Sequence, residues 1–223
     1  MNPNDILTMA EYAGIAYQAV QPEHSNISLK VIDDPQTDIQ CILRQDGKTL
    51  CISFRGTDSF KDLIADARFW KKKIPYNNPD SGIRVHSGFI DRYKKTQIRN
   101  CILSCITPKI EKIQLTGHSY GAALAVLCAV DLQYHFPKKD YEVFLFGCPR
   151  IGNRAFAASY NKRIFKTLRF ENGNDLVTKL PFRILGYCHV GSKIHVGNRR
   201  IAGVYSLSNH WCQKYYAQLF KFQ

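Results

Sequence analysis

The chain has 223 residues, of which 45% are hydrophobic and 22% charged, values typical of a globular protein. No stretch approaches the ~20 apolar residues that a membrane-spanning helix requires. Lys and Arg outnumber Asp and Glu by 31 to 18, and the net charge of +13 favours anionic partners such as phospholipid headgroups or nucleic acid. The length fits one core, so we predict a single domain over residues 1–223.

Compartment and redox state follow from two simple patterns. The first twenty residues contain two acidic residues and no Lys or Arg, unlike a secretory signal peptide, and we therefore expect a cytoplasmic protein. Eight cysteines are spread along the chain without a C-x-x-C pair. We expect reduced thiols packed in the core, with no zinc site and no other metal or cofactor.

The first part of the chain is predicted to be a helix followed by a β-meander. Asn4 can cap a helix whose apolar residues recur at helical spacing as far as Tyr17, and Pro22 would end it. Asp46-Gly47 supplies the positive φ of a hairpin turn. Strands are expected at 27–31, 39–43 and 49–54.

The segment from Ser59 to Arg84 combines a helical pattern, a basic run and a loop. An apolar stripe at its start, Phe60 with Leu63 and Ile64, has helical spacing and is followed by basic residues and a loop rich in Pro and Asn. A second helix is predicted from Asp91 through Cys105, with Pro108 just beyond its end.

A sharp turn is predicted at Gly117-His118-Ser119-Tyr120-Gly121. It follows a short buried strand at 113–116 and precedes nine apolar residues, 122–130, that are typical of a packed helix. Strand, turn and helix form the context in which G-x-S-x-G presents a nucleophilic serine, and the glycines let strand and helix approach closely. Ser119 is therefore the candidate nucleophile, and a plain surface turn is the alternative.

The remainder alternates strands with helices. Asn153 can cap a helix that continues through Tyr160, and the tail from Leu207 to Phe220 is also predicted to be helical. This alternation predicts an α/β fold with a mostly parallel central sheet flanked by helices. Strands are expected at 141–146, 167–171, 187–190 and 193–196.

A serine nucleophile needs a histidine base and a carboxylate, which follow a G-x-S-x-G serine in the order acid, then histidine. Asp175 comes just after a predicted strand, where catalytic groups collect in α/β sheets, whereas Asp131 and Asp140 fit less well. The candidate bases after Ser119 are His135, His189, His195 and His210.

Five motifs in register resemble the class 3 (fungal-type) lipases of the α/β-hydrolase superfamily. The motif around Ser119 stands in order with four other motifs, and the five together are far more specific than any one of them. They are Ser53-Phe54-Arg55-Gly56-Thr57, Val85-His86-Ser87-Gly88-Phe89, Gly117 to Gly121, Phe146 to Asn153, and Asn174-Asp175-Leu176-Val177. The resemblance implies an α/β-hydrolase fold.

The resemblance also implies roles for single residues. Ser119 would be the nucleophile, Asp175 the orienting acid and His210 the general base, with His189 as the alternative base. Backbone N–H groups of Thr57 and Tyr120 would form the oxyanion hole. The chain departs from the family around His210, which follows Asn209 where the family often has Asp.

These features predict a serine ester hydrolase that acts on acylglycerol or phospholipid esters through an acyl-enzyme. Transient docking to an anionic membrane surface fits the basic composition. The alternative is an inactive lipase-fold module that binds lipid or a protein partner. Nucleic-acid binding is not expected, because the basic residues are scattered and no aromatic platform accompanies them. Ser59–Arg84 occupies the position of the family's lid, and a mobile lid and a fixed helix both remain open.

Overall fold

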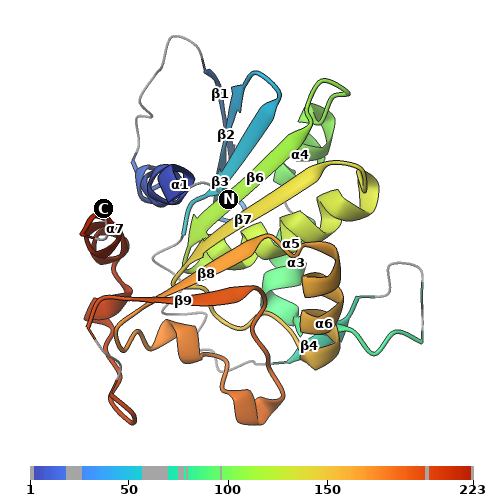
Figure 1. Ribbon diagram of the computed structural model, residues 1–223. Helices are drawn as coiled ribbons and strands as arrows, with labels where there is room; N and C mark the ends of the chain where they lie inside the picture. Colours follow the sequence, from blue (N-terminus) through green and yellow to red (C-terminus); the bar gives the residue numbers. More distant parts are fainter. Residues whose placement is uncertain are drawn as a thin grey trace.

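A central sheet runs through the computed structural model, which describes residues 3–18, 27–56, 70–74, 78, 80–95, 97–198 and 201–221 (Figure 1). Within those residues, seven strands pair in the order β1-β2-β3-β6-β7-β8-β9. The pairs β1–β2 and β2–β3 are antiparallel, and every pair from β3 onward is parallel, as predicted. The strands are β1 (Ser28–Asp34), β2 (Ile39–Asp46), β3 (Thr49–Phe54), β6 (Lys112–His118), β7 (Asp140–Phe146), β8 (Thr167–Asn172) and β9 (Ser192–Val196).

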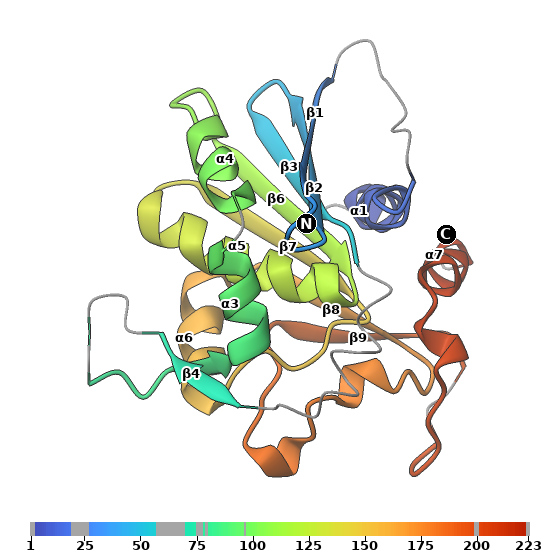
Figure 2. The same ribbon diagram turned by 180° about the vertical axis from the view of Figure 1, so that it is seen from behind.

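Helices cover both faces of this sheet, as Figures 1 and 2 show from opposite sides. Two of them, α1 and α7, lie side by side on one face, with α1 against β6 and β7 and α7 against β8 and β9. The other four helices of the described residues cover the opposite face, and α5 packs on β3, β6 and β7. The helices are α1 (Pro3–Ile15), α3 (Ser87–Lys95), α4 (Ile98–Cys105), α5 (Tyr120–His135), α6 (Arg154–Arg163) and α7 (Cys212–Phe220).

The last four residues of strand β7, 143–146, are apolar without interruption. Val143 and Leu145 belong to the hydrophobic cluster around α5, whereas Phe144 and Phe146 belong to the cluster around α1 and α7. Successive side chains of a strand point to opposite faces, so a strand covered on both sides needs apolar residues at every position. The two cores therefore meet through the sheet.

Several local predictions are confirmed. The β2–β3 hairpin turns at Gly47, whose φ is 52°, and Asn153 caps α6 by accepting a hydrogen bond from the backbone N–H of Phe156. The strand of the Ser119 motif and its helix are β6 and α5. All eight cysteines lie among the described residues and are outside any disulfide.

Other predictions were wrong in their bounds. The helix expected from Asp91 to Cys105 is two helices, because one straight helix would place the buried residues Tyr93 and Ile98 roughly 140° apart around its axis. The break at Gln97 lets both side chains reach the core. Asn4 lies inside α1 and does not cap it, since the helix already begins at Pro3.

The C-terminal region differs in two further places. Residues 187–190 form no ladder, and Cys188 makes only an isolated bridge to Gly152, because β9 takes the edge of the sheet beside β8. The last helix begins at Cys212, after a 3-10 turn η3 at Ser208–His210. Two other such turns, η1 (Val177–Lys179) and η2 (Arg183–Leu185), follow β8.

A small antiparallel pair that the sequence did not predict, β4 (Lys71–Lys73) with β5 (Arg84–His86), lies beside α6. The stripe around Phe60, Leu63 and Ile64 lies outside the described residues, as does Pro22. In the part of the chain that is described, no helix has the length and apolarity needed to cross a bilayer.

Candidate active site

Ser119 occupies the turn between β6 and α5 in a conformation that non-glycine residues rarely adopt. Its φ is 57° and its ψ is −121°. Such a conformation persists only where the surroundings impose it. The Ser119 backbone N–H donates to the carbonyl of Phe146 at 2.9 Å, which ties the turn to the end of β7.

The two glycines of the motif permit this turn by leaving room for backbone. A Cβ on Gly117 would lie 2.5 Å from the backbone carbonyl carbon of Gly121, and a Cβ on Gly121 would collide with the carbonyl oxygen of Phe54. The helix start and the end of β3 are therefore packed against the elbow backbone to backbone. This contact is the physical reason for the G-x-S-x-G spacing.

Three predicted side chains come together at this turn from distant parts of the chain. The Oγ of Ser119 lies 2.7 Å from Nε2 of His210, and Nδ1 of His210 lies 2.8 Å from Oδ2 of Asp175. Because a carboxylate oxygen can only accept, Nδ1–H donates to Asp175, and Nε2 is left to accept from the Ser119 hydroxyl. Asp175 is fully buried, and His210 has 14% of its side chain exposed.

The carboxylate of Asp175 is surrounded by donors. Its Oδ1 accepts from the backbone N–H of Val177 at 2.8 Å. Its Oδ2 accepts from the hydroxyl of Tyr215 at 2.5 Å as well as from His210. The Tyr215 oxygen in turn accepts from the backbone N–H of Asn172 at 3.1 Å. Burial, and then the nearby carboxylate, raise the pKa of Tyr215, so its hydroxyl stays a donor.

His118 fixes the segment that carries His210. A carbonyl oxygen can only accept, so His118 Nε2–H donates to the main-chain carbonyl of His210, 2.6 Å away, and Nδ1 of the neutral ring accepts from the Tyr17 hydroxyl at 2.9 Å. Burial, followed by the neighbouring His210 ring, lowers the pKa of His118 well below its usual value and keeps it neutral. Tyr17 also lies beside Gly56, where a Cβ would collide with its hydroxyl.

The sequence did not reveal the roles of Tyr17 and Tyr215. Tyr17 looked like the last apolar position of a helix, yet it lies beyond the end of α1. Tyr215 is five residues after His210, and none of the five motifs contains it. A buried hydroxyl aimed at a distant residue leaves no local pattern, so the fold alone could reveal these partners.

Of the two residues predicted to form the oxyanion hole, Tyr120 lies among the described residues and Thr57 does not. Tyr120 is the first residue of α5, and the leading N–H groups of a helix have no acceptor within the helix. The backbone N–H of Tyr120 therefore lies at the helix start next to Ser119, the position of a donor in the predicted oxyanion hole. Thr57 lies outside the described residues, directly after Gly56 at the end of β3.

The rejected acids and base have other partners. Asp131 accepts from Arg99 at 2.7 Å, and Asp140 accepts from Lys166 at 2.7 Å. His189 Nε2–H donates to the carbonyl of Thr178 at 2.8 Å, and burial lowers its pKa well below the usual value. Among the described residues, no cluster of His, Cys, Asp and Glu is arranged to hold a metal ion.

A buried ionic cluster holds the loop that carries Asp175. Glu171, at the end of β8, receives Lys179 at 2.5 Å and the guanidinium of Arg169. Burial alone would raise the pKa of Glu171, but Lys179 and Arg169 together lower it from 4.5 to about 2. The Glu171–Lys179 ion pair joins the two ends of the loop of residues 172–178.

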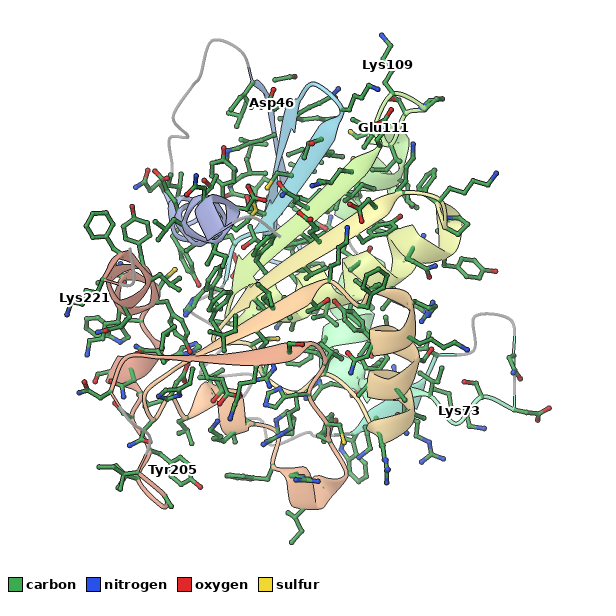
Figure 3. All side chains as sticks on the ribbon, in the orientation of Figure 1. Asp46, Lys73, Lys109, Glu111, Tyr205 and Lys221 are labelled. Atoms are coloured by element: carbon green, nitrogen blue, oxygen red, sulfur yellow. The ribbon has the colours of Figure 1, made fainter. Side chains whose placement is uncertain are left out.

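We expect Glu171→Gln to lower the free energy of unfolding by about 3–5 kcal/mol at neutral pH, because two buried cations lose their counter-charge. Urea unfolding measures this. Glu111→Gln is the matched control, since Glu111 pairs with Lys48 at 2.7 Å on an exposed turn (Figure 3) and such pairs contribute about 1 kcal/mol or less. The Glu171 contribution is present above its unfolded pKa and is lost as the pH falls toward 2. Equal losses in the two variants would contradict this assignment.

Comparison with known proteins gives the relatives of this chain. The family model described as Lipase (class 3) matches residues 51–185. A lipase of Rhizomucor miehei is 36% identical over 154 residues, which is 66% of this chain and 41% of that protein. A chloroplastic phospholipase A(1) of Arabidopsis thaliana is 32% identical over 161 residues, 65% of this chain and 36% of that protein. The chain thus spans about two fifths of the length of these curated relatives.

Solved structures agree with the sequence comparison. A triacylglycerol lipase whose catalytic centre is a serine protease triad aligns with a TM-score of 0.79 and 25% identity, over 93% of this chain and 92% of that one. The Rhizomucor miehei lipase in its propeptide complex aligns with a TM-score of 0.74 and 27% identity, over 86% of this chain and 68% of that one. The α/β-hydrolase fold is confirmed. The family model covers more than half of the residues of this chain, which therefore belongs to the class 3 lipase family.

Proposed function

We propose that this protein is a serine hydrolase of lipid carboxylic esters and that Ser119, His210 and Asp175 carry out the reaction. The observation that carries the proposal is the unbroken hydrogen-bond chain from Asp175 through His210 to the hydroxyl of Ser119. The membership of the family supports ester hydrolysis. The relatives named as lipase and phospholipase A(1) support acylglycerols or phospholipids as the substrate class.

In the first half of the proposed reaction, Ser119 Oγ attacks the ester carbonyl carbon while its proton passes to Nε2 of His210. The carbonyl oxygen becomes an oxyanion, which the backbone N–H of Tyr120 and that of Thr57 would stabilise. One such donor is worth ~3 kcal/mol in the transition state. The C–O bond to the alcohol then breaks, and His210 returns its proton to the departing oxygen. An acyl group remains on Ser119.

In the second half, a water molecule gives its proton to His210 Nε2 as its oxygen attacks the acyl carbon. The tetrahedral intermediate collapses, the bond to Ser119 Oγ breaks, and the proton on His210 returns to that oxygen. The free carboxylic acid leaves. Asp175 accepts from Nδ1–H of His210 in both halves and stabilises the imidazolium that forms.

Labelling with a fluorophosphonate tests the proposal, because these reagents react with an activated serine. We expect the native protein to be labelled at one peptide, the one that contains Ser119, and to hydrolyse short p-nitrophenyl esters. Ser104→Ala is the matched control and should still be labelled, since Ser104 is exposed and donates only to the carbonyl of Cys101. Native protein that takes no label and hydrolyses no ester would favour the alternative, a binding module with this fold.

A further inference from the structure

The turn that carries His210 has little apolar packing of its own. His210 is the last residue of η3, and the residues on either side of this turn, Leu207 and Trp211, are 56% and 64% exposed. Burial of apolar side chains therefore does not fix the imidazole, although its Nε2 has to stay within hydrogen-bonding distance of Ser119. Polar contacts to the main chain hold the turn instead.

Two side chains from the central sheet hold consecutive carbonyls of this turn. The side-chain amide of Asn172, at the end of β8, donates to the carbonyl of Asn209 at 2.9 Å. His118, at the end of β6, donates to the carbonyl of His210. The backbone N–H of His210 donates to the carbonyl of Leu207 at 3.0 Å, so both main-chain polar groups of His210 have partners. The ends of two strands thus fix the main chain at the candidate base.

The His118 ring suits this position because it is a neutral donor. The centres of the His118 and His210 rings are 4.5 Å apart. His210 becomes an imidazolium in both halves of the proposed reaction, and a second cation at that distance would oppose its protonation. Burial, followed by the His210 ring, lowers the pKa of His118, so the ring holds the carbonyl without adding a charge.

A neutral imidazole has a single N–H, and Tyr17 determines which nitrogen of His118 carries it. The Tyr17 hydroxyl donates to Nδ1 of His118, so the proton stays on Nε2, where the carbonyl of His210 needs a donor. The other tautomer would place the lone pair of Nε2 against the lone pairs of that carbonyl. The Tyr17 hydroxyl therefore acts on the base through the protonation of a second histidine.

Helix α1, which lies beside α7 on one face of the sheet (Figure 1), brings Tyr17 to His118. The Thr116 hydroxyl donates to the carbonyl of Met9 at 3.0 Å and so ties α1 to β6. Thr116 and His118 point to the same face, since alternate residues of a strand share a face. Tyr17 follows α1 in a turn that its own N–H closes by donating to the carbonyl of Gly14 at 3.1 Å.

The Tyr17 hydroxyl also lies against the main chain that follows β3. A Cβ on Gly56 would collide with this hydroxyl and would lie 3.0 Å from the carbonyl oxygen of His118, so glycine alone leaves room for both. Gly56 is the last described residue before Thr57. Tyr17 thus contacts the support of the candidate base and the end of the neighbouring strand at the same time.

We propose that His118 and Tyr17 are positioning residues that hold the general base by its main chain. His118 fixes the carbonyl of His210, and Asp175 fixes its ring. Together these contacts aim Nε2 at the Ser119 hydroxyl. Tyr17 acts through His118, whose proton it keeps on Nε2. The inference rests on the proposed function, because it requires His210 to be the base.

Kinetics with a short p-nitrophenyl ester test the role of His118. We expect His118→Leu to lower kcat about thirtyfold and to change KM by less than about threefold, because a buried ring behind the base makes no contact with a soluble substrate. His118→Gln should recover most of kcat, since its side-chain NH₂ can donate to the same carbonyl. His135→Leu is the matched control. His135 is hydrogen-bonded to Arg99 at the end of α5, roughly 22 Å along the helix from its start, so kcat should stay within about twofold.

A double-mutant cycle tests whether Tyr17 acts through His118. Tyr17→Phe should lower kcat about fivefold in the native background and leave it unchanged in the His118→Leu background. Tyr216→Phe, on the exposed side of α7, is the control for a lost tyrosine hydroxyl and should leave kcat unchanged. Effects that add in full would overturn the role of Tyr17. Should His118→Leu fail to fold, a loss in Tyr17→Phe equal to that in Tyr216→Phe would overturn the proposal.

The Nδ1–H proton of His210 reports the position of the ring without turnover. Asp175 holds this proton, which should give a slowly exchanging, low-field NMR signal that is absent in Asp175→Asn. We expect His118→Leu to lose the signal, and His118→Gln and His135→Leu to keep it. This pattern does not require ester hydrolysis, so it separates failure of this proposal from failure of the proposed function. Native kcat and an intact signal in His118→Leu would overturn the proposal, as would equal losses in His118→Leu and His118→Gln.

Discussion

Ser119→Ala is expected to lower kcat for a soluble ester by about 10⁶-fold, because the loss of a triad serine in comparable enzymes has that size. The Ser119 oxygen is the atom that would form the acyl bond, and His210 is its hydrogen-bond partner at 2.7 Å. Alanine meets the same backbone restriction as serine at a φ of 57°, so the turn itself need not change. Initial rates with a p-nitrophenyl ester measure the loss.

Two controls make this result specific. The thermal unfolding midpoint of Ser119→Ala should stay close to that of the native protein, since the fold loses a single hydroxyl. Ser104→Ala, at an exposed position on α4, should retain full activity. If Ser119→Ala kept the native turnover, Ser119 would not be the nucleophile and the triad would have to be reassigned.

The sequence was sufficient for the site residues that act through local geometry. The elbow around Ser119 needs two glycines because backbone packs against backbone there, and this requirement is visible as a motif. Asp175 follows β8, and the order serine, acid, histidine leaves three later histidines, among which the family resemblance favoured His210. The structure brings these three side chains together as predicted.

The parts that the sequence did not predict depend on long-range contacts. Tyr17 reaches His118 across 101 positions, and Tyr215 reaches Asp175 across 40. The break between α3 and α4 lets Tyr93 and Ile98 reach the same core, and the helical periodicity of the whole segment conceals this break. Local patterns predicted elements and motifs, whereas the supports of the triad required the packed fold.

The hydrogen-bond donors around Asp175 also determine the second large loss of activity that we expect. Asp175→Asn is expected to lower kcat by about 10⁴-fold while the protein stays folded, as replacement of the acid does in other triads. Every position around the carboxylate holds a donor: Val177 N–H at Oδ1, and both Tyr215 and His210 at Oδ2. An asparagine must turn its NH₂ toward one of these donors, so it cannot satisfy the site that Asp175 satisfies.

The more damaging of the two orientations explains the size of the loss. With NH₂ in the place of Oδ2, His210 must accept at Nδ1, and its proton moves to Nε2, which faces Ser119. The imidazole can then no longer take the proton of the nucleophile. kcat measured with a soluble ester, together with the rate of fluorophosphonate labelling, reports this tautomer, because both require a basic Nε2.

Comparison with Tyr215→Phe separates the tautomer from simple loosening of the site. Phenylalanine removes one of the donors to Asp175 but leaves the carboxylate able to accept from His210, so its effect on kcat should be about tenfold. Asp80→Asn, at an exposed position, should change neither rate. If Asp175→Asn lost no more activity than Tyr215→Phe, then Asp175 would only stabilise the loop, and the proton transfer at His210 would not depend on it.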